Sequence, residues 1–175
     1  MPDMQADHAA FLLQFYLPIL KLEHATTRKV IEAIPLDEGD YRPDPVAKSA
    51  LELAWHIVAA EQRFLNGIAA GKFNFDPITR PESVRNSADI AAWFAESFGK
   101  SFDRVAQLSP TQLSTEVDFR GMFQFPAVAF IAFTIRHSVH HRGQLSVYLR
   151  PMGAKVPAIY GESYDSAEAR KAAQG

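Results

Sequence analysis

Residues 126–153 read PAVAFIAFTIRHSVHHRGQLSVYLRPMG, a segment that begins with proline and ends in Pro-Met-Gly. Proline is tolerated in the first turn of a helix, and glycine is the usual residue just past its end. The pattern therefore predicts one long helix. Its first half, residues 127–133, is apolar on every side, which is typical of a helix buried between its neighbours or in a dimer interface.

The second half of this helix carries His137, His140 and His141. At about 100° per residue, His137 and His141 lie about 40° apart on one face and one turn apart in height. HExxH-type helices present two imidazoles to one metal ion in this way. His140 lies about 60° to the other side of His137, beside Arg136, so that side is more solvent-facing. Geometry alone permits either pairing.

Three more helical stretches precede this one. Apolar residues recur at helical spacing over residues 7–33, where Pro18 predicts a kink or a restart. A capping box predicts a second helix over residues 49–70, with Gly71 as its stop. A third helix is expected over residues 87–108.

The connectors between these helices are long and rich in proline. Residues 35–48 combine three prolines with acidic side chains, and residues 72–85 are too long for a simple turn. Ser109-Pro110 starts one short helical turn. Residues 116–125 alternate apolar and polar side chains, which indicates a small hairpin or an extended loop.

The length of 175 residues suits one domain that buries roughly two-thirds of its unfolded surface. A hydrophobic fraction of 47% and a charged fraction of 22% are those of a globular protein. We therefore expect a single domain over residues 1–175. Its expected fold is an all-α, up-down-down-up-type four-helix bundle with long connectors and a small hairpin before the last helix.

Composition also excludes several classes of partner and site. A net charge of −2 provides no basic field for nucleic acid. The N-terminal residues lack the positive segment of a signal peptide, and the longest apolar run, residues 125–135, is too short to cross a bilayer. We expect a cytoplasmic protein without a membrane or nucleic-acid partner. Because cysteine is absent, any metal must bind to histidine and carboxylate.

A third candidate ligand, His56, lies in WHIVAAEQRFL on the second predicted helix. Ala59 and Gly67 lie on the same face and leave room for a cavity, so His56 is placed to face the other histidines across the bundle. His8 and His24 have no partner at ligand spacing. An isolated histidine on an apolar face is usually a hydrogen-bonded core residue.

The stretch HSVHHRGQLSVYLRPMGAKVPAIYGESYD resembles the C-terminal part of DinB/YfiT-like proteins, in which HxxxH and RGQ lie on the last bundle helix. A Pro-x-x-Tyr-Gly segment closes the chain in that family. HIVAAEQRFL resembles the second-helix motif of the family, a histidine followed by a glutamate five residues later. The resemblance covers most of the chain through the order of elements. It implies that His56, His137 and His141 are the metal ligands.

The glutamate of that motif corresponds to Glu61. It lies about 140° around the helix from His56. We therefore expect Glu61 to contact a neighbouring helix rather than to act as a fourth ligand.

Three neutral imidazoles leave a divalent ion with open positions for water or substrate, as in catalytic sites. Nitrogen ligands suit Zn²⁺, Ni²⁺, Fe²⁺ or Cu²⁺, so the identity of the metal stays open. The resemblance implies an enzyme that transfers a low-molecular-weight thiol, which a chain without cysteine must take from a cosubstrate. Metal-dependent hydrolysis is the close competitor. A non-enzymatic, stress-related bundle with a structural metal is the third hypothesis.

Four polar side chains are candidate substrate contacts. Arg63 and Arg142 are possible anion contacts, and Gln144 and Tyr148 are possible hydrogen-bonding groups at the metal. Solvation of the arginines and helix packing of the tyrosine are the alternatives.

No serine is placed to act as a nucleophile. Ser138 and Ser146 lie about 100° and 180° around the helix from His137. The sequence also predicts a homodimer, because one bundle cannot cover every side of residues 127–133. The expected partner at the metal site is a small-molecule substrate.

Overall fold

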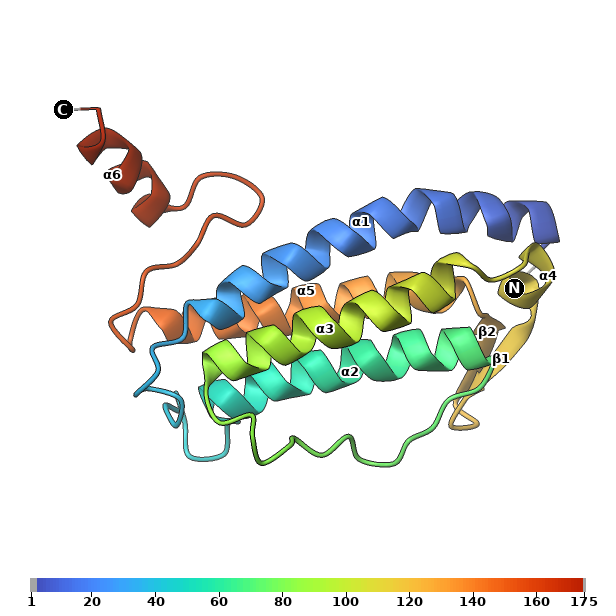
Figure 1. The fold of residues 1–175 in the computed structure, drawn as a ribbon, viewed down its shortest axis with the longest axis horizontal. Coiled ribbons are helices and arrows are strands. Elements are labelled where there is room, and N and C mark those ends of the chain that lie inside the picture. The colour runs from blue at the N-terminus through green and yellow to red at the C-terminus, as the bar shows by residue number, and fades with distance from the viewer. Residues whose placement is uncertain (1–2, 175) are drawn as a thin grey trace.

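Four long helices dominate the computed structural model, which describes residues 3–174 (Figure 1). The elements follow in the order α1 (Ala6–Glu32), α2 (Ala50–Ala70), α3 (Ser87–Ala106), α4 (Pro110–Ser114), β1 (Glu116–Phe119), β2 (Phe123–Pro126), α5 (Ala129–Leu149) and α6 (Tyr164–Ala172). The fold is therefore mostly helical, with one small antiparallel hairpin ahead of the last long helix, as the sequence predicted.

The long helices pack side by side: α1 contacts α3 and α5, and α2 contacts the same two helices. Figure 1 shows α1 and α5 running in one direction and α2 and α3 in the other. Because α2 and α3 are parallel, the connector at residues 71–86 must return along their whole length, which explains why it is long. Among residues 3–174, no helix is long and apolar enough to span a membrane.

The helix boundaries follow the local signals. At the start of α2, the hydroxyl of Ser49 accepts a hydrogen bond from the Glu52 amide, and the Glu52 carboxylate accepts one from the Ser49 amide. Asn86 and Asp89 form the equivalent box at α3. Such caps satisfy amides that have no partner within the helix. Gly71, with φ of 65°, ends α2 in the left-handed conformation that glycine adopts at low cost.

Of the kink or restart expected at Pro18, the restart does not occur, because α1 continues through Pro18 as one helix and curves along its length (Figure 1). Two other features differ from the sequence prediction. The last long helix begins at Ala129 instead of Pro126, because Pro126 pairs with Glu116 at the end of β2. Helix α6 was not predicted, and Ser163 caps it.

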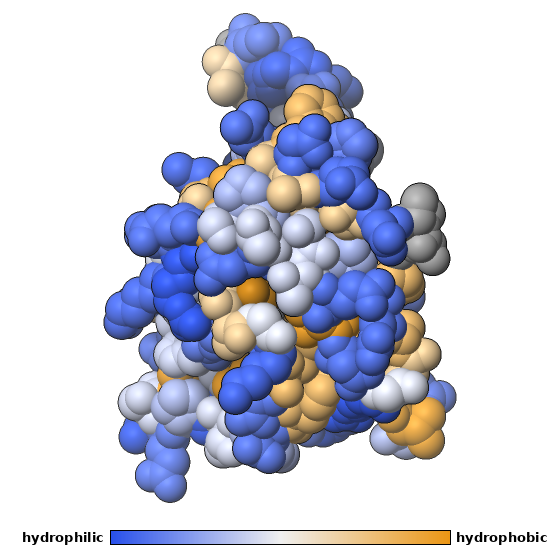
Figure 2. Space-filling model, turned by 90° about the vertical axis from the view of Figure 1, so that its right-hand side faces the viewer, coloured by the Kyte–Doolittle hydropathy of each residue, from blue (hydrophilic) through white to orange (hydrophobic). Residues whose placement is uncertain are grey.

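A cluster of phenylalanines at the hairpin covers the apolar half of α5. Phe130 is fully buried, and Phe133 stacks on Phe123 of β2 with ring centroids 5.5 Å apart. Figure 2, which views this end of the molecule, shows apolar side chains reaching the surface in patches between polar ones. The chain thus buries most of this half of α5 by itself, with Ala129, Ala132 and Phe133 partly exposed, which weakens the physical reason given for a dimer. The homodimer stays a prediction.

A buried ion pair joins α1 to α5. The guanidinium of Arg142, 1% exposed, lies 2.6 Å from the Glu23 carboxylate. It also donates to the hydroxyls of Thr27 and Tyr160. Tyr160 in turn donates to Glu23, so the segment after α5 is fastened to the same pair.

Arg142→Ala is expected to lower the free energy of unfolding by about 3–5 kcal/mol, because it leaves the Glu23 carboxylate buried without its counterion. Arg28→Ala is the matched control, since it removes only the exposed pair with Glu32. That change is expected to cost less than about 1 kcal/mol. Urea denaturation measures both values. Similar costs for the two variants would contradict the structural role given to Arg142.

Candidate metal centre

The structure brings three histidines together from two helices. His56 belongs to α2, and His137 and His141 belong to α5, which packs against it. One nitrogen from each ring lies within 4.8 Å of the other two. The Nε2 atoms of His56 and His141 are 3.1 Å apart. Two nitrogens bound at 2.0–2.1 Å to a tetrahedral ion lie about 3.3–3.4 Å apart. These two atoms are therefore close to ligand spacing already.

Gln144 determines which nitrogen of His141 carries the proton. Its Oε1 lies 2.7 Å from His141 Nδ1. An amide oxygen only accepts hydrogen bonds, so Nδ1–H is the donor and Nε2 keeps its lone pair. Hydrogen bonds of this kind orient histidines that bind metals. Gln144, predicted as a group at the metal itself, thus contacts the far side of the candidate ligand His141 and orients its ring.

His137 has a buried ring nitrogen without a partner. Among residues 3–174, its Nδ1 is the one buried side-chain nitrogen or oxygen that lacks a hydrogen bond. Leaving a buried polar group unsatisfied costs about 1–3 kcal/mol. Coordination of a divalent ion by Nδ1 itself would offset that cost. The cluster therefore fits a metal ion in both donor chemistry and spacing.

All three imidazoles are neutral at pH 7, as metal ligands must be. Burial lowers the pKa of His137 to about 3, with further lowering by His141, His56 and His140. Burial lowers the pKa of His56 to about 4, with further lowering by His141, Lys48 and Arg63. Burial lowers the pKa of His141 as well, against the hydrogen bond to Gln144.

Two cavities adjoin the cluster. His56 lines a cavity of about 470 Å³, and His141 lines another of about 500 Å³ together with Gln144 and Tyr148. Lys48 contributes to the lining of both. Small molecules can therefore reach the histidines from two sides.

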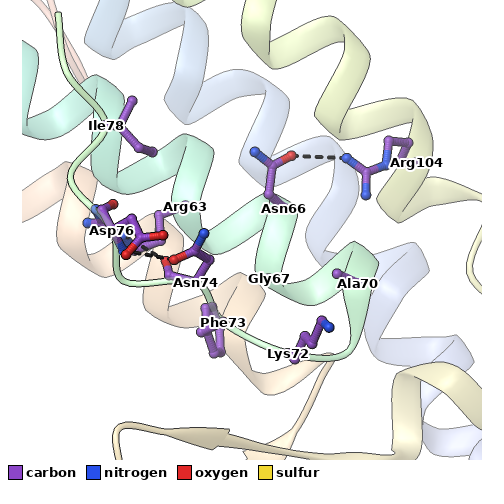
Figure 3. Close-up of a pocket in the computed structure, with 10 residues that line it drawn as sticks. All are labelled: Arg63, Asn66, Gly67, Ala70, Lys72, Phe73, Asn74, Asp76, Ile78 and Arg104. Atoms are coloured by element: carbon purple, nitrogen blue, oxygen red, sulfur yellow. Dashed lines mark hydrogen bonds between the residues drawn. The ribbon is translucent and has the colours of Figure 1, made fainter.

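The connector after α2 forms a wall of the first cavity because side chains of α2 hold it in place. Trp55 Nε1 donates to the carbonyl of Ile78 at 3.0 Å. Arg63 donates to the carbonyls of Asn74 and Asp76 at 3.2 and 3.0 Å. Figure 3 shows Arg63 and these connector residues around a separate cavity of about 300 Å³ that no histidine lines.

A glycine permits this connector to pack closely. A Cβ atom at Gly67 would lie 2.2 Å from the Phe73 ring. Gly67 therefore lines the separate cavity of about 300 Å³ together with Phe73, and not a cavity beside the histidines. Ala59, by contrast, does line the cavity beside His56.

The remaining predicted contacts fall in different places. Arg63 lines the cavity beside His56, but its guanidinium also holds the connector. Tyr148 lines the other cavity and packs against Tyr41, with ring centroids 5.8 Å apart. Arg142 is neither solvated nor an anion contact at the histidines, because its guanidinium is buried against Glu23.

Glu61 contacts neighbouring helices, as expected. Its carboxylate is 2% exposed, lies 2.8 Å from His24 Nδ1 on α1, and accepts a longer hydrogen bond, of 3.5 Å, from Ser138 on α5. Burial raises the pKa of this carboxyl, and the bonds from His24 and Ser138 oppose the rise. His24 is thus a hydrogen-bonded core residue, whereas His8 and His140 are exposed.

The cavity beside His56 is also lined by three residues that were not predicted from the sequence, Lys48, Trp55 and Arg80. Lys48 and Arg80 lie in connectors. No fixed spacing relates connector residues to a helix face, so only the folded chain shows that they lie together.

The fold and the cluster together define a mostly helical protein with a candidate three-histidine metal site. The profile of the DinB family matches residues 10–173, and the chain belongs to that family.

Two proteins of Bacillus subtilis are similar in sequence. YjoA is 30% identical over 129 residues, which span 73% of this chain and 82% of YjoA. YrdA is 33% identical over 116 residues, 62% of this chain and 64% of YrdA. The crystal structure of YjoA, a DinB-like protein, matches with a TM-score of 0.70 at 25% identity over 84% of this chain and 99% of that one. A DinB-like protein from Bacillus cereus matches with a TM-score of 0.70 at 26% identity, over 83% and 95% of the two chains.

The purified protein is expected to carry about one divalent ion per chain, as a single three-histidine site requires. His137→Ala and His141→Ala are expected to abolish binding, because two nitrogens hold such an ion weakly. His140→Ala is the matched control on the same helix and should retain the metal. Elemental analysis by mass spectrometry measures the stoichiometry. Metal loss in the His140 variant with retention in the His137 variant would reverse the assignment.

The metal-free protein is expected to lose stability as the pH falls from about 6.5 to 4. In this window the unfolded histidines take up protons, whereas His56 and His137 stay neutral in the folded chain. Urea midpoints measured at several pH values test this, and His137→Leu should reduce the dependence on pH. An unchanged slope in that variant would mean that His137 has an ordinary pKa in the folded protein.

Proposed function

We propose that this protein is a metal-dependent transferase that joins a low-molecular-weight thiol to an electrophilic small molecule. The ligands of its single divalent ion are His56, His137 and His141. The observation that carries the proposal is the cluster of three neutral imidazoles, which two cavities adjoin. The sequence has no cysteine, so the thiol must come from a cosubstrate.

The chemistry requires a thiolate at the edge of the cavities. A divalent ion on the three histidines supplies Lewis acidity, which favours the thiolate form of a thiol. In the reaction a carbon–sulfur bond forms, the bond from that carbon to its leaving group breaks, and the proton of the thiol passes to water. The chain holds the imidazoles neutral, orients His141 through Gln144, and confines both reactants between its connectors.

Among residues 3–174, no free carboxylate lies at the cluster, and this supports thiol transfer over hydrolysis. Metalloproteases with an HExxH helix use its glutamate as general base, but Ser138 occupies that position here. The carboxylate that lines the cavity beside His56, Glu52, forms an ion pair with Arg42 at 2.8 Å. A free thiol has a pKa near 8.5, well below that of free water, so the thiol needs less help from a protein base.

The same proposal includes the finer features expected from the sequence. These are one domain over residues 1–175, an up-down-down-up four-helix bundle formed by α1, α2, α3 and α5, a homodimer, and a location in the cytoplasm. The pairing and directions of the long helices support the bundle. Exposed Phe11, Phe15 and Leu22 on α1 are an apolar surface that a second copy could cover.

Metal-loaded protein is expected to accelerate the reaction of thiols with one reactive electrophile, tested over a panel of thiols by chromatography of the conjugate. His56→Ala should remove both metal and turnover. Ser138→Ala should leave turnover within about three-fold of wild type, because catalysis depends on the metal ligands and not on a protein nucleophile.

The controls separate the three hypotheses. Activity in a rigorously metal-free preparation would contradict the mechanism. Metal-dependent cleavage without any thiol would indicate a hydrolase instead. Metal loss that unfolds the chain, with no turnover of any thiol, would indicate a structural metal.

A further inference from the structure

The cavity beside His56 has a strongly positive lining. Lys48, Arg63 and Arg80 contribute three cationic side chains to it. The one carboxylate there, Glu52, is already paired with Arg42. Within residues 3–174, no carboxylate forms an ion pair with Lys48 or Arg80. The cavity therefore offers uncompensated positive charge to a ligand.

Lys48 brings this charge to the histidines. It precedes the cap of α2 and lines both cavities, beside His56 in one and His141 in the other. An anion bound by Lys48 thus lies next to the candidate metal centre.

The second cavity has a different character. Apart from Lys48, His141 and Gln144, it is lined by Pro43, Ala47, Leu53, Val147 and Tyr148. A carboxylate in this largely apolar cavity would lose hydration with little compensation. The charged part of a substrate is therefore favoured in the cavity beside His56, where Trp55 also offers an aromatic wall.

We propose that Lys48 and Arg80 bind a carboxylate of the thiol cosubstrate in the cavity beside His56, and so select acidic thiols. This inference rests on the proposed function, since it names the class of thiol that the site accepts. Arg63 borders the same cavity, but it also holds the connector through Asn74 and Asp76. Lys48 and Arg80 are therefore the better residues for a test, because their replacement spares those bonds.

Isothermal titration of the zinc-loaded protein with two thiols tests the proposal. Mercaptosuccinate, which carries two carboxylates, should bind at least tenfold more tightly than 2-mercaptoethanol, and the difference should shrink as salt is added. Lys48→Gln and Arg80→Gln should each weaken mercaptosuccinate about tenfold while leaving 2-mercaptoethanol and zinc binding unchanged. Arg85→Gln, on the same connector but outside the cavity, is the matched control and should have no effect.

Succinate titrated into metal-free protein separates this inference from the proposed function. If succinate binds and needs Lys48 and Arg80, the anion site stands even where no thiol turns over. The inference is overturned if both thiols bind equally well to wild type. It is equally overturned if Arg85→Gln weakens mercaptosuccinate as much as Arg80→Gln does, and thiol transfer would survive either result.

Discussion

The buried carboxylate of Glu61 constrains how three helices meet. A carboxylate removed from water is costly unless other groups satisfy it, and here the partners come from α1, through His24, and from α5, through Ser138. His24 is itself fixed by stacking on Phe98, with ring centroids 3.7 Å apart. Glu61 follows His56 by five residues, and Ser138 directly follows His137. The helices α2 and α5 that meet at this buried acid are therefore the same two that carry the imidazoles.

Helix α5 divides its polar residues between this scaffold and the metal centre. Arg142 and Ser138 point to buried acids on α1 and α2, whereas their neighbours His141 and His137 meet His56. Gln144 completes the second group by holding the proton on His141 Nδ1. The buried ion pair of Arg142 with Glu23 fixes α5 against α1, so the scaffold alone holds the imidazoles close together. Such preorganisation is what a site with open coordination positions requires.

Periodicity and resemblance predicted what lies along single helices. The stripe of His137 and His141, the cap at Ser49 and the position of Glu61 away from His56 all depend on angles within one helix, which the sequence determines. Contacts between residues of different helices could not be predicted from periodicity. Arg142 was expected to be an anion contact or a solvated side chain, whereas Glu23, about 120 positions away, makes its burial possible. Lys48 and Arg80 reach the cavity through irregular connectors, for which no period exists.

The proposed function depends on the binding of one ion to imidazoles from α2 and α5. X-ray absorption spectroscopy of the zinc-loaded protein tests this most directly, because imidazole rings give a characteristic outer-shell scattering pattern. The account predicts three imidazole nitrogens at about 2.0–2.1 Å, completed by one or two lighter ligands from solvent. The spectrum of the His140→Ala variant should be the same. A shell of oxygen ligands without imidazole scattering, or a spectrum that changes only when His140 is replaced, would contradict the central claim.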